Sequence, residues 1–179
     1  MNQPRPFEPL CRRWVARLKF PPYRHLPGET PHPRIHPEGH SYGVTEPLGE
    51  KPLSSAAWWE NEAYLFGVDL YNYAYWWEAH EQWEAAWKQA EGDTAHLLQG
   101  MIQLGAALIK WNLGNDRGRE GLWSRSHQHL HQIVSPQWCG VCIRPLAEEA
   151  GRFFNHHPRA PLRGWLEGPV LQLETLPTR

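Results

Sequence analysis

The chain has 179 residues, of which 21% are charged, with a formal net charge of −1, three cysteines and eleven tryptophans. A net charge this close to zero gives no global field that would draw the chain to nucleic acid or to an anionic membrane. No apolar run approaches the roughly 20 residues needed to cross a bilayer, and three cysteines do not make the disulfide framework of a small secreted domain. The composition predicts a cytoplasmic protein with one globular domain, and neither a nucleic-acid nor a membrane partner is expected.

Proline is concentrated in the first 52 residues, which hold eleven of the seventeen prolines and four of the eleven histidines. Proline lacks a backbone donor and breaks helices, so regular structure is not expected over most of this segment. The exception is 10–20, where apolar residues at helical spacing predict a helix. Because Tyr23 and Tyr42 offer apolar anchors, we expect residues 1–53 to form an arm that wraps around the rest of the chain.

From Ser54 onward proline is absent until Pro136, and apolar residues recur at steps of three and four. This period predicts a helical domain over 54–157, followed by an irregular tail over 158–179. The sequence favours an all-α fold, a compact bundle of about five antiparallel helices with an extended proline-rich arm. The predicted helices cover about 56–73, with Ser54 or Ser55 as N-cap, and then 75–90, 97–111, 117–134 and 146–155. No strand is predicted.

The third of these helices reads LLQGMIQLGAALIKW and is apolar almost all round, which predicts that it is the buried centre of the bundle. Gly100 and Gly105 would each cost about 1 kcal/mol relative to alanine in such a helix. We therefore expect neighbouring helices to approach the backbone closely at these two positions.

The second helix contains WWEAHEQWEAAW, in which His80 and Glu84 are four residues apart and share one face, with Trp87 three residues further on. One interpretation is an ordinary hydrogen-bonded pair that fixes helix packing. The other is part of a metal site for zinc, iron or manganese, because Glu81 also lies close, whereas Glu78 points to another face. The order HEQWE lacks the second histidine of the zincin motif, so a protease of that kind is excluded.

Two ligands on one helix are too few for such a metal, so other segments would have to contribute. The candidates are His40, His32 and His127. Pro33 and Pro37 forbid a helix around the arm histidines, which leaves a loop that can fold back over His80. His127, His129 and His131 alternate and would splay over different faces of a helix, so at most one or two of them join a site.

Gln99 and Gln103 repeat the four-residue spacing on the central helix, where a buried amide must find hydrogen-bond partners. If they face the His80–Glu84 pair, they form either a satisfied polar network or a pocket for a small ligand. The stretch WCGVC superficially resembles a thioredoxin redox motif, but it lacks a preceding strand and an αβ context. A lone CxxC also supplies half of a zinc site, with His156 or His157 as partners.

The segments EAHEQWEAAW, LLQGMIQLGAAL and GNDRG together resemble the bacterial and archaeal domain of unknown function 309 family over about residues 65–133. The hallmark of that family is a histidine, three residues, a glutamate, two residues and an aromatic, which match His80, Glu84 and Trp87. The resemblance implies an all-α fold of antiparallel helices and a suspected metal-binding role for the motif, and no known reaction. Residues 21–43 also resemble an N-terminal extension that some members carry.

Two functions from different classes follow from these observations. The first is a metal- or ligand-binding helical protein, with a divalent metal on His80, Glu84 and His40, and with Trp87, Gln99 and Gln103 lining the cofactor or ligand site. It includes a metal-dependent hydrolase in which Glu81 or Glu84 acts as the catalytic base. The second is a non-enzymatic protein-interaction or structural module in which the His-Glu-Trp face is a packing network. The tryptophan excess favours either a homodimer interface or burial of the same surface under the arm.

Overall fold

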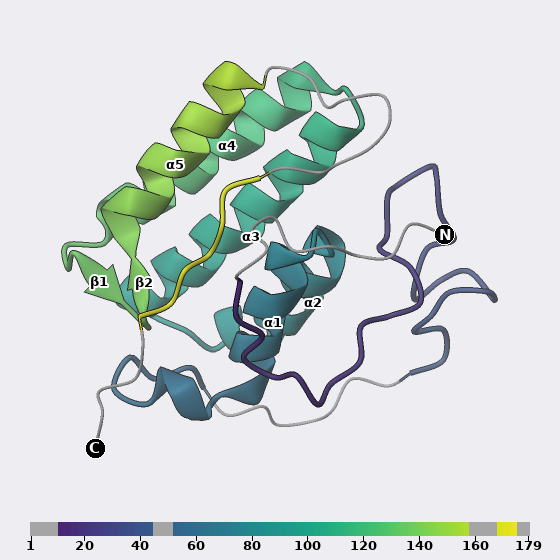
Figure 1. The fold of residues 1–179 in the computed structure, drawn as a ribbon, viewed down its shortest axis with the longest axis horizontal. Helices are drawn as coiled ribbons and strands as arrows, with labels where there is room; N and C mark the ends of the chain where they lie inside the picture. The colour runs from purple at the N-terminus through teal and green to yellow at the C-terminus, as the bar shows by residue number, and fades with distance from the viewer. Residues whose placement is uncertain (1–10, 45–51, 158–167, 175–179) are drawn as a thin grey trace.

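The computed structural model describes residues 11–44, 52–157 and 168–174, and it confirms the all-α prediction. Helix α3 lies at the centre, with α1 and α2 on one side and α4 and α5 on the other (Figure 1). A hairpin of two strands, each two residues long, is the only sheet among the described residues. The five α-helices are α1 (Glu62–Asn72), α2 (Trp76–Trp87), α3 (Gly92–Asn112), α4 (Asp116–Gln132) and α5 (Ile143–His156).

The first helix begins later than the sequence predicted. A short 3₁₀ turn, Trp58–Glu60, comes before α1, and Asn61 is the N-cap, with its side chain accepting a hydrogen bond from the backbone N–H of Tyr64. The predicted caps Ser54 and Ser55 are therefore wrong. Asn61 satisfies a helix N-terminal donor that a serine six or seven residues earlier does not reach.

The core is built around α3, whose buried side chains face α2 on one side and α4 on the other. Gly100 confirms the expected close approach, because a Cβ built there would meet Cδ2 of Leu130 in α4 at 2.8 Å. At Gly105 the nearest atom is the carbonyl oxygen of Trp76, at 3.5 Å, which is ordinary contact. The two glycines thus lie against α4 and α2 respectively.

A small hairpin joins α4 to α5, and it corrects the expectation that the chain has no strand. Strand β1 (Gln137–Trp138) pairs antiparallel with β2 (Val141–Cys142), and the turn between them places Cys139 and Gly140 at positive φ. Two-residue strands are too short to produce an alternating pattern that the sequence would reveal. The segment 168–174 runs beside this hairpin, with Leu173 bridged to Val141.

The predicted helix over 10–20 is wrong for its described part, because residues 11–20 form bends and turns. Leu10, where that helix was to begin, lies outside the described residues. The buried carboxylate of Asp69 in α1 accepts hydrogen bonds from the backbone N–H groups of Trp14 and Val15, both at 2.8 Å. Arg13 also donates to Asp69, at 3.3 Å. These bonds from a distant helix hold the segment in a non-helical course.

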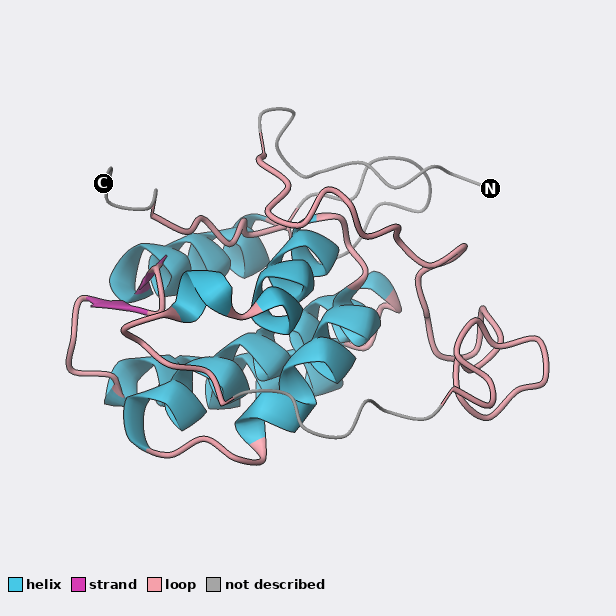
Figure 2. Cartoon of the chain, turned by 90° about the horizontal axis from the view of Figure 1, so that it is seen from below, coloured by secondary structure: helices cyan, strands magenta, loops and turns pink. Residues whose placement is uncertain are grey.

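The described part of the arm runs along α1 and continues to the side of α2, where residues 32–43 form a compact loop (Figures 1 and 2). Backbone hydrogen bonds from Gly39 to His36 and from Ser41 to Pro33 close this loop. At the other end of the chain, Asn72 of α1 binds both the N–H and the carbonyl of Leu171. Within the described ranges, no helix has the length and apolarity to cross a membrane.

Candidate metal centre

Packing of α2 decides which of its side chains face outward. Trp76, Ala79, Trp83 and Ala86 are buried. The indole N–H of Trp83 donates to the carbonyl oxygen of Tyr64 in α1, at 3.1 Å, which fixes the rotation of the helix. The polar face that remains is half-buried and contains three potential metal ligands, His80, Glu81 and Glu84.

These three residues offer ligand atoms that all lie within 4.8 Å of one another. No other group of three or more His, Cys, Asp or Glu side chains in the described parts of the chain meets that condition. Nε2 of His80 is 3.9 Å from Oε2 of Glu84, too far for a hydrogen bond. One imidazole and two carboxylates form a donor set that suits zinc, iron or manganese, and three protein ligands leave a coordination position open.

His80 is in the protonation state that a metal requires. Burial lowers the pKa of its imidazole, and the nearby Lys88 lowers it further, while Glu84 acts in the opposite direction. A neutral imidazole has a free lone pair at neutral pH, so no proton has to be displaced before a cation binds.

Two cations already pair with the carboxylates of this group. Nε of Arg34, in the arm, lies 2.6 Å from Oε2 of Glu81. Nζ of Lys88, four residues after Glu84 on the same helix, lies 3.0 Å from Oε1 of that residue. A metal ion would therefore compete with these two side chains for the carboxylates. The contribution of Arg34 was not predicted from the sequence, because it depends on the path of the arm.

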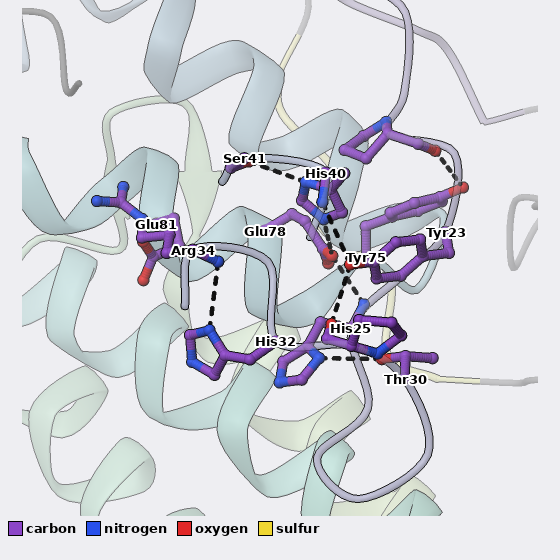
Figure 3. A network of polar contacts seen from close by, with 12 residues as sticks. Tyr23, His25, Thr30, His32, Arg34, His40, Ser41, Tyr75, Glu78 and Glu81 are labelled. Atoms are coloured by element: carbon purple, nitrogen blue, oxygen red, sulfur yellow. Dashed lines mark hydrogen bonds and ion pairs between the residues drawn. The ribbon is translucent and has the colours of Figure 1, made fainter. Parts of the chain in front are cut away.

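Glu78 faces the other side of α2 and anchors the arm (Figure 3). Its Oε1 accepts a hydrogen bond from the backbone N–H of His25 at 2.7 Å and lies 3.0 Å from Nε2 of His40. Nδ1 of His40 lies 2.8 Å from the hydroxyl oxygen of Ser41, so donation from Nε2 to Glu78 leaves Nδ1 to accept from Ser41. The sequence did place Glu78 on a different face from His80, but it did not identify these partners. The sequence feature that could have indicated such partners is a carboxylate on the buried side of a helix, because a buried carboxylate must accept hydrogen bonds.

Three histidines of the arm pack against the ring of Trp77. The imidazole rings of His25, His32 and His40 lie edge-on to the indole ring, with centroid distances of 5.3, 5.4 and 6.5 Å. Nδ1 of His32 also accepts a hydrogen bond from the backbone N–H of Arg34, at 3.3 Å. These contacts direct the arm across α2 so that the Arg34 side chain reaches Glu81.

The structure separates some residues that the sequence grouped together. His40 binds Glu78 and does not join the His80 group, and His127 lies on α4, stacked on His131. The side-chain oxygen of Gln103 accepts from Nε of Arg125 in α4, at 3.3 Å, so this amide is directed toward α4. Gln99, one turn earlier on α3, is half-buried.

Trp87, the third residue of the family hallmark, is the last residue of α2. It is partly buried and packs against the hydrophobic core. Its ring therefore closes the end of the site helix against the body of the protein.

The WCGVC stretch does not have the features of a redox site. Cys139 lies in the hairpin turn and Cys142 is the N-cap residue of α5, and both are free thiols. Burial raises the pKa of Cys139 to about 12. Burial, together with Glu174, also raises the pKa of Cys142. Redox catalysis requires a thiolate, so these shifts oppose it.

The fold and the site thus define a small helical protein with a His-Glu-Glu cluster on one helix. Residues 64–122 match the family model described as Domain of unknown function (DUF309), which confirms the resemblance found in the sequence. The matched part includes all of α2 and α3, and so contains His80, Glu81 and Glu84. No curated protein matches the chain.

Proposed function

We propose that His80, Glu81 and Glu84 bind one divalent cation, zinc, iron or manganese, and that the protein is a metal-binding helical protein. The observation that carries this proposal is the convergence of one neutral imidazole and two carboxylates within 4.8 Å on two consecutive turns of α2. His40, which the sequence favoured as a third ligand, is replaced in this proposal by Glu81.

Hydrolysis is the chemistry that suits such a centre. A bound cation of this kind polarises a carbonyl or phosphoryl oxygen and lowers the pKa of a water molecule. Glu81 and Glu84 are the candidate bases, and each would first have to release the basic side chain, Arg34 or Lys88, that pairs with its carboxylate. His80 remains a ligand, because burial lowers the pKa of its imidazole and so favours the neutral form that binds a metal.

The decisive experiment is elemental analysis of the untagged protein, purified without chelator, alongside His80→Ala and Glu84→Ala. We expect about one metal ion per chain, lost in both variants, because removal of one of three ligands leaves too few. His131→Ala and Glu148→Ala, at exposed positions on α4 and α5, are the matched controls and should keep the metal. Equal metal content in all five proteins would rule out this centre.

A second function is favoured by the exposed apolar side chains of the arm loop. Ile35, Tyr42 and Val44 are 74%, 53% and 65% exposed. Under this alternative the protein is a non-enzymatic interaction module, with another protein or a second copy of the chain as partner, and the His80 face has a structural role. His80→Ala would then lower the free energy of unfolding without changing the metal content. Sedimentation analysis of the purified protein tests for a homodimer.

A further inference from the structure

Two ion pairs lie at the candidate metal centre. Glu81 and Glu84 carry two negative charges, and Arg34 and Lys88, each within 3.0 Å of one of them, carry two positive charges. These four side chains therefore sum to zero before any cation binds.

A divalent cation bound among these four side chains would give the whole group, cation included, a net charge of +2. The backbones of the two basic residues are held beside the site. Lys88 is the C-cap residue of α2, one turn after Glu84. Arg34 follows the buried Pro33, and its backbone N–H donates to His32, which packs on Trp77.

Solvent screens the charge on Lys88, whose side chain is 58% exposed, more than the charge beside Glu81, which is 17% exposed, so screening offsets the excess only in part. An anion is the partner that restores the balance. The guanidinium group of Arg34 suits a phosphate in particular, because its planar fork can donate two parallel hydrogen bonds. The open coordination position of a three-ligand centre provides a third contact.

We propose that Arg34 and Lys88, together with the cation held by His80, Glu81 and Glu84, form a binding site for a dianionic phosphate group, so that phosphate esters are the substrate class of this centre. The inference rests on the metal site proposed above. In the metal-free protein the guanidinium group of Arg34 pairs with the carboxylate of Glu81. When the cation binds Glu81, the guanidinium group leaves that carboxylate and binds the phosphate instead.

The experiment uses manganese and methyl phosphate, which is a dianion at about pH 7.5, above the second pKa of about 6 that phosphate esters have. Electron paramagnetic resonance of free Mn²⁺ measures metal binding. In the same samples, ³¹P relaxation measures the approach of methyl phosphate to the bound Mn²⁺. The unsubstituted protein is compared with Arg34→Gln, Lys88→Gln and Arg34→Lys, and with Arg117→Gln, an exposed arginine on α4, as the control.

We expect Mn²⁺ to be bound in all five proteins. Methyl phosphate affinity should fall at least five- to tenfold, on the order of one charge-assisted hydrogen bond, in Lys88→Gln, and by as much or more in Arg34→Gln, which loses the two-pronged donor. It should fall less in Arg34→Lys and not at all in Arg117→Gln. Arg34→Gln should also bind Mn²⁺ more tightly, because a competitor for Glu81 is gone; a merely structural role for Arg34 does not produce this gain.

Bound Mn²⁺ with the same ³¹P relaxation in every variant would overturn the phosphate site and leave the metal site standing. Acetate that competes as well as inorganic phosphate would also overturn it, because the charge argument requires a dianion. Free Mn²⁺ in the unsubstituted protein would refute the metal site itself and, with it, this inference.

Discussion

Nε2 of His40 and Oε1 of Glu78 lie 3.0 Å apart, and the two side chains are only 5% and 4% exposed. The same carboxylate oxygen accepts the backbone N–H of His25. One buried oxygen of α2 thus holds two points of the arm that are fifteen residues apart in the sequence. The arm lies on α2 because Glu78 satisfies donors that burial would otherwise leave unpaired.

Glu78→Ala should release the arm from α2. Loss of the acceptor leaves the His25 N–H buried without a partner, so the free energy of unfolding should fall by about 2–3 kcal/mol. Tryptic cleavage after Arg34 should become faster than in the unsubstituted protein. Glu148→Ala, an exposed position on α5, should change neither the unfolding curve in urea nor the cleavage rate. An unchanged cleavage rate in Glu78→Ala would show that Glu78 does not hold the arm.

Asp69→Ala should loosen the first part of the arm. The carboxylate accepts from the N–H groups of Trp14 and Val15 and from Arg13, and it is buried, so about 2–4 kcal/mol of stability should be lost. Hydrogen exchange of residues 11–20 should accelerate. Glu62→Ala removes the pairing of Glu62 with Arg17, in which both side chains are exposed, and should cost less than about 0.5 kcal/mol. Equal effects of the two substitutions would contradict the assignment of Asp69 as the anchor.

The stability of the protein should decrease as the pH falls through 6.5. Burial lowers the pKa of His25 below its ordinary value of 6.5, and His32 and His40 lower it further, while Glu78 and the backbone at Pro31 act in the opposite direction. Between the lowered folded-state pKa and 6.5, the unfolded chain binds more protons than the folded one, so stability rises with pH in that window. The contribution is complete above 6.5 and is lost on acidification. His80 and His129, whose pKa values are also lowered, act in the same direction.

Urea unfolding of the metal-free protein at about pH 7.5 and about pH 5.5 measures this dependence. His25→Gln should show a smaller difference in the free energy of unfolding between the two conditions, whatever its absolute stability. The exposed His36, replaced in the same way, should leave the difference unchanged. A His25→Gln protein with the full pH dependence would mean that His25 is not responsible.

The two glycines of α3 should respond in opposite directions to alanine. Gly105→Ala places a Cβ in ordinary contact with Trp76 and should stabilise the protein by about 0.5–1 kcal/mol through helix propensity. Gly100→Ala places a Cβ 2.8 Å from the buried Leu130 side chain, and overpacking should destabilise it by about 1–3 kcal/mol. Thermal unfolding of the pair is the measurement. A stabilised Gly100→Ala would mean that α4 can move away from α3 at little cost.

Helical periodicity was sufficient to predict the centre of the bundle because α1 and α3 bury mostly apolar side chains, and a period of 3.6 residues is a local property of the sequence. The same rule failed over residues 11–20. Leu18 and Trp14 have helical spacing there, but the carboxylate of Asp69, some 55 residues away, binds the backbone N–H groups that a helix would have left for its own turns. Long-range hydrogen bonds of this kind leave no mark in a local pattern.

For the candidate site too, the local part could be predicted from the sequence and the long-range part could not. His80, Glu81 and Glu84 come together because they lie on one helix, and spacing alone gives that result. Arg34 and His40 meet α2 through a proline-containing loop whose course depends on Pro33 and on Trp77, so the sequence left open which face of α2 they would reach. Gln103 was expected near His80 but contacts Arg125, because a helix packed on two sides offers two directions for a polar side chain.

Helix α1 holds segments from both ends of the described chain within one turn. Asp69 binds the arm at Trp14, across 55 residues, and Asn72 binds Leu171, across 99 residues. During synthesis the arm therefore leaves the ribosome well before its binding site exists, and the segment at Leu171 is synthesised after all five α-helices of the described residues. Both sets of hydrogen bonds require α1 to be in place. We therefore expect the bundle to form first and the segments at Trp14 and Leu171 to dock on α1 afterwards. A nascent chain stopped before Leu171 would lack both hydrogen bonds between Asn72 and Leu171, and Asn72 would retain its contact with Sγ of Cys11.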